Sequence, residues 1–220
     1  MSDLATMEWK GRAGPFPLKL GPGVFSPTST SRTLADAIEI TPGDVVIDVG
    51  CGSGVLAFVA AKLGAAKVYG CDLSAPAVEM ARRNAKALGL DDVCEFRHGD
   101  LLDPVRDVRA SVVIGDVSGI PDELAAVSGW FDRVPAGGPT GAELPTKLLH
   151  SIGDTLALVE RDDFALGCGV RIRAAASIAQ RGVYSCQLGQ ECQLAGLILA
   201  FQRQGAGPGV LHVTAGVIGL

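Results

Sequence analysis

Short apolar runs alternate along this chain with amphipathic stretches. Four runs, at residues 45–47, 67–72, 94–97 and 111–115, contain the β-branched, aromatic and cysteine residues of buried strands. Helical stretches follow the first two runs. A chain that alternates strands and helices in this way is typical of an α/β domain built around a mainly parallel sheet.

The helix after the second run has clear boundaries. Ser74 is a typical N-cap, Pro76 lies in the first turn, and Gly89 is a typical stop. Its apolar face is formed by Ala77, Val78, Ala81, Ala85 and Leu88. We therefore predict a helix from residue 75 to residue 88, with this face toward the sheet.

A glycine-rich turn connects the first strand to the first helix. Asp48 ends the strand, and Gly50, Gly52 and Gly54 follow at alternate positions. The spacing differs from the Gly-x-Gly-x-x-Gly turn of dinucleotide-binding proteins, because Val55 follows the third glycine. A carboxylate beside the turn repels pyrophosphate and favours a cationic ligand. S-adenosylmethionine (SAM), which carries an ammonium and a sulfonium and no phosphate, fits this pattern.

Two further acids end the next two strands. Asp72 can accept hydrogen bonds from both hydroxyls of a ribose, and Asp100 can accept one from an adenine amino group. The backbone N–H after Asp100 can donate to the adenine ring. Each acid alone is more simply interpreted as a turn or cap residue. Three such acids at consecutive strand ends, behind a glycine turn, indicate a SAM site.

These motifs resemble the class I SAM-dependent methyltransferases over roughly residues 24–157. The resemblance implies a Rossmann-like, mainly parallel seven-stranded sheet with helices on both faces, and SAM as the cofactor. The cofactor-binding residues that it implies are Asp48, Gly50, Cys51, Gly52, Gly54, Asp72, Leu73, Gly99, Asp100, Leu101 and Asp116.

The methyl acceptor is expected beside the end of the fourth strand. Residues 116–121 align with the Asn-Pro-Pro-Tyr-Ile-Pro element of the release-factor glutamine methyltransferases, and residues 137–149 resemble the glycine-rich turn and helix that follow it. The glycine turn and second strand also resemble the ribosomal-protein L11 methyltransferases. The long N-terminal recognition domains of both groups find no match here, so we expect a compact acceptor.

The acceptor element departs from that pattern. Asp116 stands at the Asn place and Gly119 at the Tyr place, and both prolines are replaced. The stacking platform for a planar amide or adenine is therefore lost, while an acid can hold an amine or take its proton. We predict Asp116 as the catalytic residue, against the alternative of a solvated loop acid. The predicted substrate-binding residues are Val117, Ser118, Gly119 and Ile120. His98 and His150 are weaker candidates for a base.

The composition limits the partners. A net charge of −5 without a Lys/Arg run disfavours a nucleic acid. No apolar stretch has the length of a membrane span or the form of a signal peptide, so we expect a cytoplasmic protein, monomeric or homodimeric. Cys51, Cys71 and Cys94 are predicted as buried thiols. Cys186 and Cys192 as metal ligands or a disulfide are the less favoured interpretation, and no metal is expected.

Both ends of the chain differ from the middle. Residues 1–22 are predicted as an N-terminal arm, lying over the acceptor pocket or disordered, and residues 23–220 as the methyltransferase domain. Within it, residues 158–220 are atypical, because all six glutamines lie at or after 180 and all six lysines at or before 147. A divergent end of the sheet with a final antiparallel pair, a dimer contact, or an altered reading frame would each explain this difference.

Taken together, the sequence predicts methyl transfer from SAM to a nitrogen, less readily a carbon or oxygen, of a small molecule or a protein side chain. Two alternatives remain open at this point. The chain could methylate a nucleic-acid base, which predicts a salt-dependent complex. It could also be a SAM-binding partner subunit without activity of its own.

Overall fold

The structure is a computed structural model of the whole chain, and it describes residues 4–128, 136–144, 146–148 and 151. Three further stretches of backbone, residues 171–174, 197–203 and 211–217, are described as strands. Nothing below concerns the structure of the other residues.

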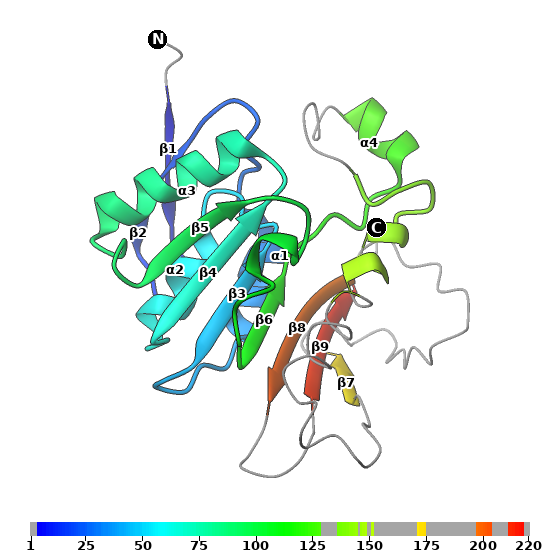
Figure 1. Cartoon of the computed structure of the whole chain (residues 1–220). Helices are drawn as coiled ribbons and strands as arrows, with labels where there is room; N and C mark the ends of the chain where they lie inside the picture. Colours follow the sequence, from blue (N-terminus) through cyan, green and yellow to red (C-terminus); the bar gives the residue numbers. More distant parts are fainter. Residues whose placement is uncertain are drawn as a thin grey trace.

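Four parallel strands form the centre of the molecule. β3 (Val45–Val49) pairs with β4 (Lys67–Asp72) on one side and with β6 (Val112–Gly115) on the other, and β4 pairs with β5 (Cys94–His98). The order is therefore β5-β4-β3-β6 (Figure 1). The predicted α/β class and the parallel sheet are confirmed. Because the four strands run in one direction, their carboxyl ends lie at one edge of the sheet.

One face of this sheet is covered by three helices, α1 (Ser29–Ala37), α2 (Val55–Lys62) and α3 (Ala75–Leu88). Alternate strand residues such as Val46 and Phe96 point to this face and join the side chains of the helices, with Phe58 of α2 at the centre. The ring of Phe58 meets that of Phe96 edge to face, with ring centroids 5.9 Å apart. This face holds the larger of the two apolar clusters.

The boundaries predicted for α3 are confirmed. Ser74 is its N-cap, with the side chain accepting from the Ala77 N–H, and Gly89 is its left-handed C-cap. Both signals are local, because a cap depends on residues within one turn of the helix end.

The opposite face of the sheet carries a second apolar cluster. Ile47, Val49 and Val113 point to this side and pack with the 3₁₀ turn η1 (Asp103–Val105). Leu148 is fully buried in the same cluster. Covering both faces explains why the strands are apolar on both sides.

The sheet continues beyond β6. β8 (Leu197–Arg203) lies antiparallel to β6, β9 (Leu211–Val217) is antiparallel to β8, and β7 (Arg171–Ala174) is parallel to β9. The expected final antiparallel pair corresponds to β8 and β9. Since only isolated stretches after residue 151 are described, the count of seven strands and the nature of residues 158–220 stay predictions.

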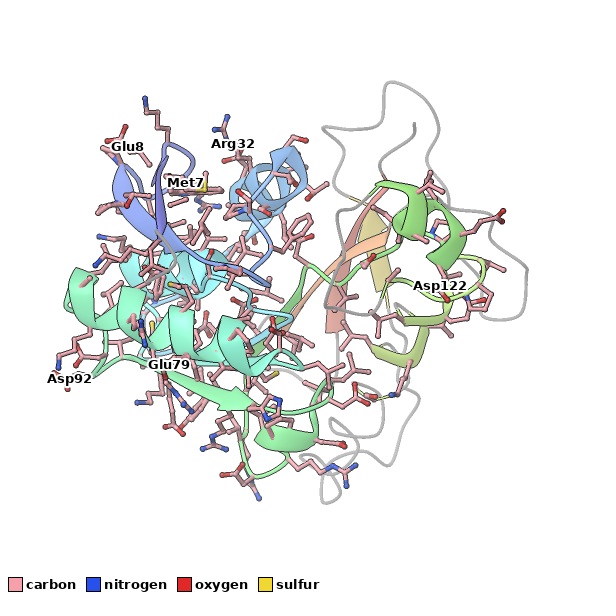
Figure 2. The ribbon with its side chains drawn as sticks, turned by 90° about the horizontal axis from the view of Figure 1, so that it is seen from above. Met7, Glu8, Arg32, Glu79, Asp92 and Asp122 are labelled. Atoms are coloured by element: carbon pink, nitrogen blue, oxygen red, sulfur yellow. The ribbon has the colours of Figure 1, made fainter. Side chains whose placement is uncertain are left out.

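The N-terminal segment is a hairpin. β1 (Ala5–Trp9) pairs antiparallel with β2 (Phe16–Leu20), and β2 packs against α3. Figure 2 shows Met7 and Glu8 on this hairpin, away from Asp122 at the start of α4 (Asp122–Ser128).

Two tethers hold the hairpin. The side chain of Asn84 accepts from the Lys19 N–H and donates to its carbonyl, and the indole of Trp9 is only 1% exposed. Residues 5–20 are therefore a packed hairpin and not a disordered terminus, and an arm over the acceptor pocket stays a prediction. The boundary at residues 22 and 23 itself stays a prediction.

Candidate functional site

The glycine turn lies across the carboxyl ends of β3 and β4. The N–H groups of Gly50 and Cys51 both donate to the carbonyl of Cys71, at 2.8 and 3.0 Å. Gly50, Gly52 and Gly54 all have positive φ, at 71°, 54° and 91°, which explains the glycines. A side chain at Gly54 would also meet the Phe58 ring, at 2.5 Å from the added carbon. The turn is therefore fixed by both conformation and packing.

Asp48 lies beneath this turn and is 1% exposed. Its Oδ2 accepts from the Ala57 N–H at 3.0 Å, so the carboxylate caps α2, whose own N-cap residue is a glycine. Its Oδ1 has no hydrogen-bond partner among the described residues. Burial raises the pKa of Asp48 to about 8, with the charges of Asp116 and Asp72 adding to the effect.

This pKa predicts a pH-dependent stability in the absence of ligand. Between about pH 4, where an unfolded Asp ionises, and about pH 8, the folded chain holds a proton that the unfolded chain has lost. The free energy of unfolding should therefore fall as the pH rises, by on the order of 1 kcal/mol per pH unit. Urea titrations at pH 5, 6 and 7 measure the slope.

Asp48→Asn is the matched variant for this slope, since it keeps an oxygen for the Ala57 N–H and cannot ionise. It should flatten the pH dependence. Equal slopes in both proteins would show that Asp48 is already ionised in the folded chain.

Asp72 ends β4 and connects the glycine turn to α3. Its Oδ2 accepts from the Gly52 N–H and its Oδ1 from the Ser74 N–H, both at 2.8 Å. Burial raises its pKa, while these two bonds and the nearby His98 lower it. Each carboxylate oxygen retains a second acceptor position for a ligand hydroxyl. Leu73, the next residue, is 47% exposed and offers an apolar surface beside it.

The residues after β5 lie next to this acid. The Gly99 N–H donates to the Asp72 carbonyl at 3.0 Å. Leu101 adopts a positive φ of 43°, and its carbonyl accepts from the Cys71 thiol at 2.9 Å. Asp100 forms an ion pair with Lys147, with 2.5 Å between Nζ and Oδ2. No sequence pattern connects Lys147 to an acid 47 residues away, so this ion pair was not predicted.

Asp116 follows β6 at the same edge of the sheet. Its Oδ2 accepts from the Ser31 hydroxyl of α1 at 2.8 Å. Burial raises its pKa, and the hydrogen bond from Ser31 lowers it. Asp116 is thus partly buried and hydrogen-bonded to α1, rather than fully solvated. Val117 then approaches the glycine turn, with its Cγ1 3.4 Å from where a Cβ on Gly50 would lie.

The two motifs expected around the acceptor lie together. The Gly137 N–H donates to the Ile120 carbonyl at 2.8 Å, and a side chain at Gly141 would lie 2.5 Å from the Gly119 carbonyl. Ser118 accepts from the Ile120 N–H within the loop. The segment from Val117 to Ile120 is thus supported by the glycine-rich turn that follows it in the sequence.

Other candidates lie apart from Asp116 or outside the described residues. His98 is exposed, and its ring Nε2 lies 2.9 Å from the Leu73 carbonyl, on the cofactor side. His150, Cys186 and Cys192 lie outside the described residues. The buried, free thiols predicted at Cys51, Cys71 and Cys94 are confirmed. The described residues hold neither a cluster of three potential metal ligands nor a helix able to cross a membrane.

The site residues suit SAM in three respects. Asp48 Oδ1 is a buried carboxylate oxygen without a partner in the described chain, which suits a nearby cation. The backbone at Gly52 is open to a ligand, because the nearest atom to an added side chain would be a carbonyl 3.9 Å away. Asp72 with exposed Leu73 offers a polar acceptor beside an apolar surface, as a nucleoside requires.

One family model matches the part of the chain that contains the glycine turn and the strand-end acids. The family described as "Ribosomal protein L11 methyltransferase (PrmA)" matches residues 19–117. Over these residues the chain matches the L11 methyltransferases. The resemblance predicted from the glycine turn and the strand-end acids is thus confirmed, and the matched segment extends from β2 to Val117, the residue after Asp116.

Individual L11 methyltransferases are also similar to this chain. The ribosomal protein L11 methyltransferase of Caldanaerobacter subterraneus subsp. tengcongensis is 39% identical over 127 residues, 53% of this chain and 41% of that protein. The one from Escherichia coli (strain 55989 / EAEC) is 33% identical over 150 residues, 68% of this chain and 48% of that protein. This chain therefore spans about half or less of these L11 methyltransferases.

Among solved structures, an RNA methyltransferase from Salinibacter ruber in complex with S-adenosylhomocysteine is 32% identical, with a TM-score of 0.35. The match covers 40% of this chain and 57% of that one.

Proposed function

We propose that this chain is a SAM-dependent methyltransferase that transfers a methyl group to a nitrogen of a protein side chain. The observation that carries the proposal is the gathering of the glycine turn with Asp48, Asp72 and Asp116 at one edge of a parallel sheet. The match to the L11 methyltransferases supports a protein acceptor, and ribosomal protein L11 is the first one to test. Such a reaction belongs in the cytoplasm.

The cofactor roles follow from the geometry at the strand ends. Asp72 accepts hydrogen bonds from the ribose hydroxyls at the oxygen positions that its backbone donors leave free. Leu73 and Leu101 flank the adenine, Asp100 accepts from its amino group, and Asp48 supplies negative charge beneath the methionine part. The remaining proposed contacts are backbone ones, made by Gly50, Cys51, Gly52, Gly54 and Gly99.

The acceptor role falls to Asp116 and the loop from Val117 to Ile120. Asp116 accepts its hydrogen bond from Ser31 at Oδ2, so Oδ1 can hold an ammonium group. A partly buried carboxylate whose pKa is raised is also a suitable proton acceptor for an amine that must lose a proton before it attacks. Gly119, in the place of an aromatic platform, leaves room for a flexible aliphatic amine.

The protein's part in the reaction is small. SAM supplies a methyl group that is already activated on a sulfonium. The chain must hold the acceptor nitrogen in line, exclude water and take up one proton. Asp116 takes that proton at Oδ1, and the loop that Gly137 and Gly141 support excludes water from the acceptor side.

The first test is a calorimetric titration of the purified chain with SAM and with S-adenosylhomocysteine. We expect micromolar binding of both. Incubation with labelled SAM and L11, with lysine-containing peptides or with RNA then identifies the acceptor. Absence of binding would overturn the proposal. Binding with label transfer only in the presence of a second protein would identify the chain as a partner subunit instead.

A further inference from the structure

Ser31, in the first turn of α1, connects this helix to Asp116, the proposed acceptor acid. Thr28 is the N-cap of α1 and Ser31 is its third residue, and the two form a capping box. In this box the Ser31 hydroxyl oxygen accepts from the Thr28 N–H at 3.3 Å. One lone pair of the hydroxyl oxygen therefore accepts a hydrogen bond that caps the helix.

The proton of the same hydroxyl points to Asp116. Ser31 Oγ donates to Asp116 Oδ2 at 2.8 Å, across 85 residues of sequence. Ser31 is only 3% exposed, so the donor side of this bond is shielded from water. The capping bond occupies a lone pair of this oxygen, and the O–H is therefore free to donate to Asp116.

We propose that Ser31 is a positioning residue for the acceptor site: it holds Asp116 by Oδ2, turns Oδ1 toward the acceptor nitrogen and stabilises the ionised carboxylate. This inference rests on the proposed function and extends it to a residue of another element. No strand-end or glycine motif contains Ser31.

The charged groups around Asp116 show why the Ser31 hydroxyl matters for its ionisation. On the neighbouring strand β3 the titratable group is Asp48, whose charge, when it is ionised, disfavours a second negative charge at Asp116. Arg32, the next residue of α1, is exposed and points outward (Figure 2). β8 pairs with β6 on its other side, through backbone alone in the described structure. Within the described residues, the Ser31 hydrogen bond is the interaction that lowers the pKa of Asp116 against its burial.

The test compares three variants of the full chain. Ser31→Ala removes the hydroxyl, Ser31→Thr restores it, and Thr28→Ala weakens the same capping box without touching Asp116. Carbon-13 NMR of labelled aspartate follows the Asp116 carboxyl, assigned with Asp116→Asn. Calorimetry with S-adenosylhomocysteine and the pH profile of kcat/KM complete the set.

We expect Ser31→Ala to raise the pKa of Asp116 by about one pH unit, and to move the acidic limb of kcat/KM upward equally. At pH values below the pKa this shift corresponds to about a tenfold loss of kcat/KM, and at pH values well above it kcat/KM should change little. Ser31→Thr should restore both values. Thr28→Ala should lower thermal stability and leave the Asp116 titration in place.

An unchanged pKa of Asp116 in Ser31→Ala would overturn the inference. An equal shift of that pKa in Thr28→Ala would overturn it too, because the effect would then come from helix capping. The failure of the proposed function looks different. In that case the wild-type chain does not bind S-adenosylhomocysteine, while the carboxyl titration still measures how Ser31 acts on Asp116.

Discussion

Asp72→Ala should weaken the binding of S-adenosylhomocysteine by about 100-fold or more. The variant loses two charge-assisted hydrogen bonds to the ribose, worth roughly 1.5–3 kcal/mol each. It also leaves the N–H groups of Gly52 and Ser74 without the acceptor that each has at 2.8 Å. The glycine turn and the start of α3 would then no longer be joined through this side chain. Calorimetry on folded variant and wild type measures the ratio of dissociation constants.

Two further variants separate binding from folding. Asp72→Asn keeps the size of the side chain and one acceptor oxygen, and should fall between wild type and alanine. Asp103→Ala removes an exposed acid of η1 that pairs with Arg106, and should leave the affinity unchanged. Wild-type affinity in Asp72→Ala would contradict the cofactor assignment at the end of β4.

Trp9→Ala should lower the free energy of unfolding by about 3–5 kcal/mol, the usual cost of removing a large buried aromatic side chain. Trp9 is 1% exposed, and its ring centroid lies 6.3 Å from that of Phe16. Its indole N–H donates to the Arg12 carbonyl at 3.0 Å. Urea unfolding, followed by circular dichroism, measures the loss.

Glu8→Ala is the control for the tryptophan, because it changes the same strand at an exposed position that forms a surface ion pair with Lys10. Its stability should stay within about 0.5 kcal/mol of wild type. A Trp9→Ala loss below about 1 kcal/mol would show that the hairpin does not pack as described.

The hairpin bears on the site because it is joined to the helix that carries Ser31. The guanidinium of Arg12 donates to the carbonyls of Ala35, Asp36 and Ile38 at the end of α1. α1 is thus held at its carboxyl end by the hairpin and at its amino end by Asp116. The segment before the glycine turn therefore helps to position Asp116, the proposed acceptor acid.

The sequence by itself determined the features that depend on near neighbours. The glycine turn, the strand-end acids and both caps of α3 are each encoded within a few residues, so their patterns predicted them correctly. The four parallel strands were found within one or two residues of their ends, because burial on both faces produces recognisable apolar runs. The glycine turn and the strand-end acids also predicted the resemblance to the L11 methyltransferases, which the family match over residues 19–117 confirms.

Only the tertiary structure decided how the acids are used. Asp48 caps α2, Asp72 ties the glycine turn to α3, and Asp100 pairs with Lys147. The simpler interpretation of strand-end acids as turn and cap residues is therefore correct for Asp48 and Asp72, alongside their proposed ligand roles. The packed hairpin and the bond from Ser31 to Asp116 left no mark in the local pattern. Such contacts join segments far apart in sequence, and it is the packing of the whole domain that brings them together.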